Sequence, residues 1–249
     1  MTHLQRKFGW IPDDPGDDPV FKCEKPRVFS RTMDLRWKHI ILPVRDQGHA
    51  GSCTGFGVTG IEYAAMKSDP TFNTQPFHPS ELFAYWCGRR FKREDEGASI
   101  RDVVDATSEY GVAPSHLWLY KESNVLIEPP RRAFEQAIKF KTIKKARVPQ
   151  NIQDIINILA SGYPIVFGHR CHSNFFNVKK DGIVPMPKGV FLGGHCEYWH
   201  GYDLNKSWLI AQNSWGKNRG DRGHEYFPFD YVLDPEICMD MWVIYEISI

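Results

Sequence analysis

The sequence predicts an α+β fold of two lobes, and three observations lead to this prediction. Helix signatures gather in the first half of the chain, whereas short runs of β-branched and aromatic residues gather in the second half. The chain has 249 residues, of which 42% are hydrophobic, so it can bury a substantial core. Because helices and antiparallel strands that are separated along a chain pack as separate layers, the interface between them is a natural cleft.

The beginning of the chain differs from the rest. It is rich in Pro and Asp and has only scattered apolar residues, among them Trp10, without a sustained period. We interpret it as an extension that contributes no core element. The predicted parts are the extension at 1–33 and a domain at 34–249, with a helical lobe at about 45–148 and a β lobe at about 149–249.

Two predicted helices carry start signals. Ser99 is followed three residues later by Asp102, an acidic variant of the capping box, and Gly111 ends that helix. Asn151 with Asp154 repeats the pattern. The later β-branched and aromatic runs predict antiparallel strands, which lie at 163–167, 198–202, 208–212, 224–227 and 242–247.

Cys53 is the candidate nucleophile. It follows small residues and precedes an apolar run, 56–66, which predicts a buried helix with Cys53 at its N-terminus. Free backbone N–H groups and the helix dipole stabilise a thiolate there and can lower the pKa of a thiol from about 8.5 to about 3.5–7.5. Glycines at 55, 57 and 60 disfavour a helix, so their presence suggests close packing against other backbone.

Three segments resemble the papain family of cysteine peptidases. The first joins Pro43–Gly48 to Gly51–Cys53, the second is Gly193–Tyr202 around His195, and the third is Gln212–Gly216 around Asn213. Their order is that of the family, and the intervals from Cys53 are close to its spacing of roughly 130–150 residues. The likeness runs from about residue 34 to 242 and is closest to the compact bacterial and phage-type branch.

This resemblance implies a papain-like fold and a cysteine endopeptidase that forms a thioester acyl-enzyme. His195 would accept the proton of Cys53, and Asn213 would orient the histidine ring without adding charge. Gln47 would help to form the oxyanion hole. Gly97 and Trp215 would contact substrate, and Trp215 would also shield the hydrogen bond between Asn213 and His195.

The sequence departs from the family pattern at four positions. Ala50 stands where secreted relatives have a disulfide cysteine, Thr54 where many have tryptophan, and Gly194 where aspartate is common. Arg219 replaces a tryptophan, which predicts a more polar wall on the leaving-group side of the cleft. The family carries a long inhibitory prosegment, so we expect residues 1–33 to lie in or beside the cleft and limit access to it.

Other functions remain open at this point. A Cys-His-Asn site also suits an acyltransferase or amidase, because an amine can resolve a thioester as well as water can. An inactive binding module would have no reason to retain the four site residues. Zinc at His169, Cys171 and His172 is disfavoured because alternate side chains on a strand point to opposite faces, and we expect no metal and no cofactor.

Composition limits the partners. A formal net charge of +1, from 31 Lys and Arg against 30 Asp and Glu, provides no field that would attract nucleic acid or an anionic membrane. We expect a peptide or protein substrate. The start of the sequence lacks the apolar stretch of a secretory signal, and the missing disulfide cysteine suits a reducing compartment, so a cytoplasmic location is expected.

Overall fold

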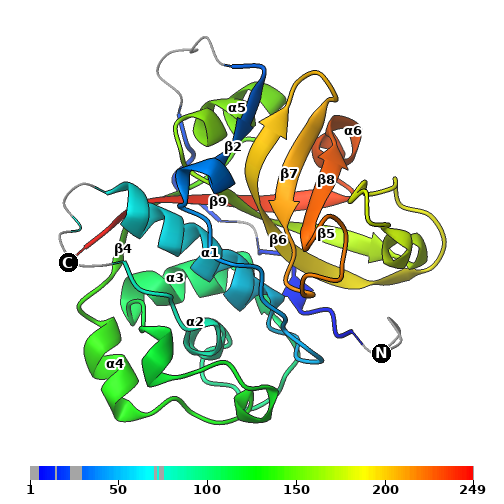
Figure 1. Ribbon diagram of the computed structural model, residues 1–249. Helices are drawn as coiled ribbons and strands as arrows, with labels where there is room; N and C mark the ends of the chain where they lie inside the picture. The colour runs from blue at the N-terminus through cyan, green and yellow to red at the C-terminus, as the bar shows by residue number, and fades with distance from the viewer. Residues whose placement is uncertain (1–5, 15, 23–29, 70–71, 73–75, 249) are drawn as a thin grey trace.

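Most helices form a group beside the large sheet in the computed structural model, while two others pack elsewhere against its strands, and this arrangement confirms the α+β prediction (Figure 1). The structure describes residues 6–14, 16–22, 30–69, 72 and 76–248. The α-helices are α1 (Cys53–Ser68), α2 (Glu81–Gly88), α3 (Ile100–Glu109), α4 (Arg131–Ala137), α5 (Ile152–Ala160) and α6 (Phe229–Leu233). The strands are β1 (Trp10–Ile11), β2 (Thr32–Asp34), β3 (Ala98–Ser99), β4 (Thr142–Arg147), β5 (Ile165–His172), β6 (Phe191–Asp203), β7 (Trp208–Gln212), β8 (His224–Pro228) and β9 (Cys238–Ile247).

One large antiparallel sheet forms the second half of the molecule. Its strands follow the order β4-β9-β5-β6-β7-β8, and β2 pairs with β6 beside this path. In the register of β5 and β6, His169 lies opposite His195. Since paired residues project to the same face of a sheet, both histidines belong to one cluster of side chains.

Helix α1 lies between helices α2 and α3 on one side and the sheet on the other (Figure 1). Nearly all of its residues are buried, so it has no solvent face of its own. A Cβ at Gly55 would overlap the backbone of α2, one at Gly57 would overlap Cys196, and one at Gly60 would overlap Tyr198. The three glycines therefore allow the close packing that the sequence suggests. No helix in the described parts of the chain is both long and apolar enough to cross a membrane.

The predicted capping residues begin their helices as expected. The side chain of Ser99 accepts a hydrogen bond from the backbone N–H of Asp102 at 3.0 Å. Asn151 accepts one from the backbone N–H of Asp154 at 2.9 Å. Each side chain satisfies a donor that the first turn of a helix leaves free, so local sequence is enough to define these two starts.

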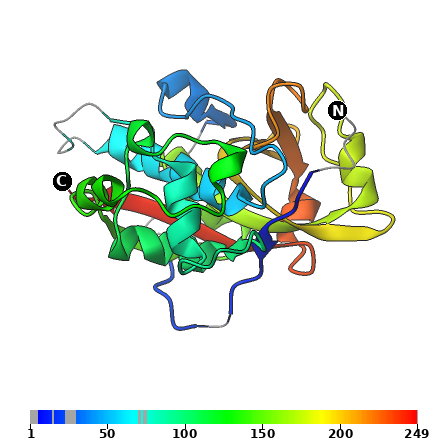
Figure 2. The same cartoon turned by 90° about the horizontal axis from the view of Figure 1, so that it is seen from below.

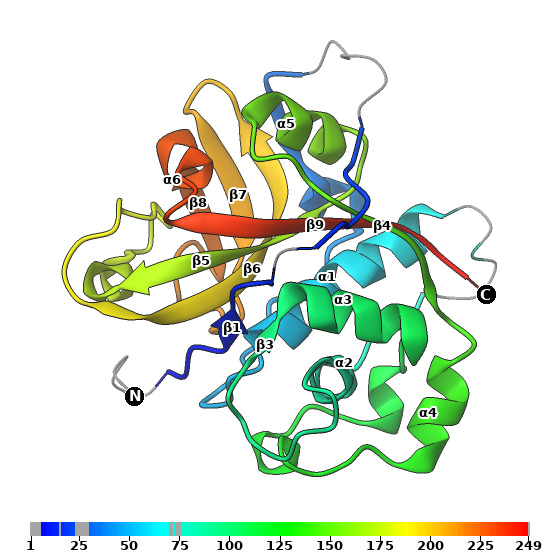
Figure 3. The same cartoon turned by 180° about the vertical axis from the view of Figure 1, so that it is seen from behind.

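The prediction that the extension contributes no core element is wrong. Trp10 is 4% exposed and packs in the same hydrophobic cluster as Cys53 and Val58. Strand β1 pairs in parallel with β3, and Figures 2 and 3 show this segment running between the helices and the large sheet. The sequence contains too few apolar residues here to show a period, yet the large tryptophan ring is enough to anchor the segment.

Candidate active site

Cys53 is the first residue of α1, as predicted, and its side chain is fully buried. The loop before it is held by side chains from the helical part of the molecule. Asp95 accepts hydrogen bonds from the backbone N–H of Gly51 at 3.0 and 3.1 Å. The hydroxyl of Tyr120 lies 2.8 Å from that of Ser52 and donates to the carbonyl oxygen of Gln47 at 2.7 Å. The loop is therefore fixed on both sides of its turn.

His195 on β6 and Asn213, directly after β7, lie next to each other. The distance between His195 Nε2 and Asn213 Oδ1 is 3.1 Å, and both residues are buried. Within the described residues, His195 Nδ1 has no hydrogen-bond partner. The ring of Trp215 packs against that of His195, with 4.7 Å between the ring centroids.

The side-chain amide of Gln47 contacts the loop before Cys53. Its Oε1 accepts a hydrogen bond from Ser214 Oγ at 2.6 Å, which fixes which end of the amide faces which partner. Its Nε2 then donates to the carbonyl oxygen of Ala50 at 2.7 Å and to that of Lys7 at 3.3 Å. Gln47 thus already contacts a peptide carbonyl from the N-terminal segment, residues 6–14.

The N-terminal segment covers Cys53. The carbonyl oxygen of Gly9 accepts a hydrogen bond from the N–H of Ala98 at 2.9 Å, and the backbone of Gly9 lies near enough to Cys53 to oppose the rise in the pKa of the thiol. A Cβ at Gly9 would overlap the backbone of Gly51. Only a residue without a side chain fits at this point, because the segment crosses so close to the loop before Cys53.

Two aromatic residues flank Gly9 and pack on the sheet side. The ring of Phe8 makes edge contacts with His195 at 6.3 Å and with Trp215 at 5.7 Å. Trp10 lies against β5 and β6, where a Cβ at either Gly168 or Gly194 would overlap it. The glycine that departs from the family pattern at position 194 therefore provides the space that the N-terminal segment occupies.

Charged side chains anchor the segment at both ends. Arg6 forms a salt bridge with Asp46, and Lys7 forms one with Asp95 at 3.0 Å. Farther along, Asp13 accepts hydrogen bonds from the backbone N–H of Arg101 and from Trp242 Nε1, both at 2.9 Å. The last two contacts lie beyond the part of the segment that covers Cys53.

Burial changes the acid–base state expected for this pair. It raises the pKa of Cys53 to about 12, although neighbouring backbone N–H groups oppose the shift. Burial also holds the pKa of His195 well below its usual range, and the nearby His169 adds to the effect. The low thiol pKa expected from the helix terminus alone is thus wrong for this arrangement, in which both groups are neutral.

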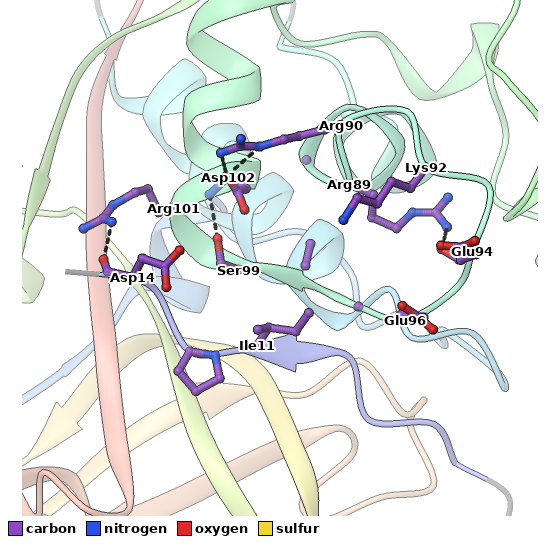
Figure 4. Close-up of a pocket in the computed structure, with 14 residues that line it drawn as sticks. Ile11, Asp14, Arg89, Arg90, Lys92, Glu94, Glu96, Ser99, Arg101 and Asp102 are labelled. Carbon is purple, nitrogen blue, oxygen red and sulfur yellow. Dashed lines mark hydrogen bonds and ion pairs between the residues drawn. The ribbon is translucent and has the colours of Figure 1, made fainter. Parts of the chain in front are cut away.

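Gly97 lies beside the segment, with its N–H donating to the hydroxyl of Tyr85 at 3.0 Å. Next to it is a pocket of about 330 Å³, which Figure 4 shows between the N-terminal segment, the loop after α2 and the start of α3. Charged residues dominate its lining, and Arg90 and Asp102 form a salt bridge at 2.5 Å across one side. Here Ala98, rather than Gly97, donates to the neighbouring extended chain.

The prediction that Arg219 makes the leaving-group side of the cleft more polar is wrong. The residue is 4% exposed and lies behind Trp215, where its guanidinium donates to Glu225 and to the carbonyl oxygen of Phe175. Arg219 therefore adds a charge to the interior of the protein and does not make the wall of the cleft more polar. An ion pair with a buried glutamate, which the sequence pattern does not reveal, draws the guanidinium inward.

The disfavoured zinc residues have other partners. His169 Nδ1 lies 2.9 Å from the hydroxyl of Tyr231, and His169 Nε2 lies 3.3 Å from Glu197 Oε1. Cys171 shares the face of His169, with its sulfur 3.8 Å from Nδ1. No group of three or more potential metal ligands occurs among the residues that the structure describes.

Sequence reasoning missed two buried carboxyl groups behind Asn213. Asn213 Nδ2 donates to Glu197 Oε1 at 3.2 Å and to Glu225 Oε2 at 3.1 Å. A signal for Glu197 was available: it follows His195 by two residues in a strand, so the two side chains share a face. Glu225 lies on β8, and only the pairing of β7 with β8 brings it here.

Comparisons with known proteins find cysteine peptidases and peptidase-like proteins. A family model described as papain family cysteine protease matches residues 29–234. An uncharacterized peptidase C1-like protein of Acanthamoeba polyphaga mimivirus is 34% identical over 279 residues, which cover 98% of this chain and 88% of that protein. Chymopapain of Carica papaya is 24% identical, with 84% of this chain and 57% of that protein covered.

Solved structures show the same fold. Xylellain, a cysteine protease from Xylella fastidiosa, superposes with a TM-score of 0.87 at 28% identity, and the match covers 96% of each chain. The Carica candamarcensis cysteine protease CMS1MS2, solved in complex with E-64, gives a TM-score of 0.63 at 24% identity, over 80% of this chain and 88% of that one.

Proposed function

Because the chain belongs to the papain family and is a cysteine-type peptidase, we propose that Cys53, His195 and Asn213 form its catalytic triad. His195 Nε2 faces Asn213 Oδ1, which leaves Nδ1 as the nitrogen that accepts the thiol proton. The sulfur then attacks the peptide carbonyl carbon, and the proton passes from Nδ1 to the leaving amine as the C–N bond breaks. Water hydrolyses the thioester that remains.

Gln47 Nε2 and the backbone N–H of Cys53 supply the oxyanion hole. The observation that best supports this assignment is the 3.3 Å hydrogen bond from Gln47 Nε2 to the carbonyl oxygen of Lys7. A peptide carbonyl occupies this donor while the next residues of the same peptide lie against His195 and the Cys53 sulfur. The arrangement therefore suits an extended peptide at the reacting atoms.

Gln47→Ala tests this role. Because the lost donor acts mainly on the negative oxygen of the tetrahedral intermediate, kcat should fall by about 10²–10³-fold while KM changes little. Steady-state hydrolysis of a fluorogenic peptide measures both constants. Gln136→Ala, an exposed glutamine on α4, is the control and should match the wild type. An unchanged kcat in Gln47→Ala would remove Gln47 from the mechanism.

Substrate would lie along the backbone at Gly97 and Ala98 and against the ring of Trp215. Strand β1 pairs with β3 at this edge, which supports an extended chain as the bound form. Trp215 already contacts one aromatic residue of the N-terminal segment, Phe8. Substrate and the N-terminal segment would thus compete for the same surface.

The same contacts support a second part of the proposal, that the N-terminal segment restrains the peptidase. It covers the thiol, occupies the amide of Gln47 and keeps Cys53 in the neutral form, since burial raises the thiol pKa to about 12. A neutral thiol is a poor nucleophile. Displacement of the segment would give both water and substrate access to Cys53 and Gln47.

A further inference from the structure

A cluster of buried polar side chains lies behind the triad and takes no part in the mechanism above. Its central members are Glu197 on β6, Glu225 on β8 and Arg219 in the loop between β7 and β8. Each is at most 4% exposed. Buried charges are costly unless they are paired, so an arrangement of this kind at a reaction centre calls for a functional explanation.

The charges of the cluster can be assigned from its contacts. Arg219 Nε donates to Glu225 Oε1 at 2.5 Å, which keeps Glu225 ionised. Glu197 and Glu225 lie close together, because both accept a hydrogen bond from the same nitrogen, Asn213 Nδ2. Two adjacent buried carboxylates repel each other, so one of them carries a proton, and Glu197, which forms no ion pair with Arg219, is that one. Burial raises the pKa of both carboxyl groups, so the pair does not carry two charges at neutral pH, and the guanidinium of Arg219 stabilises the one charge on Glu225.

The remaining titratable groups around the pair are neutral. Burial lowers the pKa of His169 to about 3, and it raises the pKa values of Cys171 and Tyr231 well above their usual ranges. His195 is also neutral here. Arg219 and Glu225 therefore form the charged pair of the cluster, and Glu197 connects it to Asn213 as an uncharged acid.

This arrangement fixes the direction of the Asn213 amide. An amide side chain has similar shapes in its two orientations, so sterics alone would not choose between them. Glu225 Oε2, being ionised, can only accept and must face the NH₂ group of Asn213. Asn213 Oδ1 is then turned toward His195, whose Nε2 must carry hydrogen, and Nδ1 is left free as the base.

We propose that Glu225, held by Arg219 and supported by a protonated Glu197, is a positioning residue that fixes Asn213 and, through it, the tautomer of His195. The inference rests on the proposed triad. It adds that the direction of the asparagine amide is set by a buried charge and not by packing.

Two isosteric substitutions separate this role from a structural one. In Glu225→Gln, Arg219 can only donate, so it faces the oxygen of the new amide. The new NH₂ group then faces Asn213, and the amide of Asn213 must turn to accept from it. In Glu197→Gln, the amide reproduces a protonated carboxyl: it donates to Glu225 and accepts from Asn213. The first variant should lose activity and the second should keep it, although both replace a buried glutamate with glutamine.

The assay uses the full chain. For Glu225→Gln we expect kcat to fall about tenfold or more with KM within about twofold of the wild type, and for Glu197→Gln we expect kcat within about twofold. Thermal unfolding checks that each variant is folded. In an Asn213→Ala background, Glu225→Gln should have no further effect, because the residue it positions is gone.

Several results would overturn the inference: full activity in Glu225→Gln, an equal loss in Glu197→Gln, or an equal loss with and without Asn213. If Glu225→Gln does not fold, the double variant Arg219→Leu/Glu225→Leu replaces it, because it removes both ends of the ion pair and leaves only the neutral acid Glu197, which can donate to Asn213. The same tenfold loss is expected, and wild-type kcat in this variant would contradict the inference.

The rate of Cys53 alkylation by iodoacetamide, measured against pH, distinguishes this inference from the proposed function. It needs an activated thiol but no peptide hydrolysis. If the wild type hydrolyses no peptide, the proposed function fails, while slower alkylation in Glu225→Gln than in Glu197→Gln still supports the positioning role. Equal alkylation rates in these two variants would reject it.

Discussion

Cys53→Ala should reduce peptide hydrolysis to background, with kcat lower by about 10⁴-fold or more, and His195→Ala should reduce it by a similar amount. Without the sulfur no thioester forms. Without the imidazole no base accepts the thiol proton and no acid protonates the leaving amine. Because the two groups act as one unit, the double variant should be no less active than either single variant. Progress curves with a fluorogenic peptide measure all three.

Matched substitutions control for structural damage. Cys87→Ala removes another buried thiol, on α2, and His116→Ala removes a histidine of the short helix Ser115–Leu117. Both should keep kcat within about twofold of the wild type. Hydrolysis that survives in Cys53→Ala, with the protein folded and free of contaminating peptidase, would show that another residue is the nucleophile.

Removal of residues 1–12 should raise kcat/KM at least about tenfold, because only the fraction of molecules with the segment displaced can bind substrate. This truncation removes Phe8, Gly9 and Trp10 from the site. It leaves Asp13, whose contacts with Arg101 and Trp242 tie the rest of the extension to the domain. A deletion to Met33 would remove these contacts as well and would mix loss of inhibition with loss of stability.

A control variant and an inhibition experiment accompany the truncation. Val20→Ala changes an exposed residue of the same extension, which pairs with Arg147 and lies outside the segment that covers Cys53, and should leave kcat/KM unchanged. A synthetic peptide of residues 6–14 should inhibit the truncated chain in competition with substrate. Equal activity of full and truncated chains, both folded, would mean that the segment does not restrain the enzyme.

The sequence predicted the positions of the candidate site residues better than their surroundings. Cys53, Gln47, His195 and Asn213 stand in short segments whose neighbours resemble a known family, and their positions depend on a helix start and two strands that local patterns define. The covering segment was harder to predict in detail. Its burial depends on Trp10 fitting beside Gly168 and Gly194, residues far away in the chain.

The buried carboxyl groups show a second limit. Glu197 could be placed near His195 from strand alternation, but its partner on β8 becomes a neighbour only through strand pairing. Arg219 looked like a surface residue because long cations usually are. Its inward direction follows from the charge of Glu225, and contacts of this kind have no local signature in the chain.

The most direct test of the central claim, an activatable Cys53 beneath a displaceable segment, is labelling with an epoxysuccinyl inhibitor under reducing conditions, followed by intact mass and peptide mapping. We expect one adduct at Cys53, formed faster in the chain that lacks residues 1–12, slowed in His195→Ala and absent in Cys53→Ala. No adduct in either the full or the truncated chain, or an adduct at another cysteine, would contradict the account.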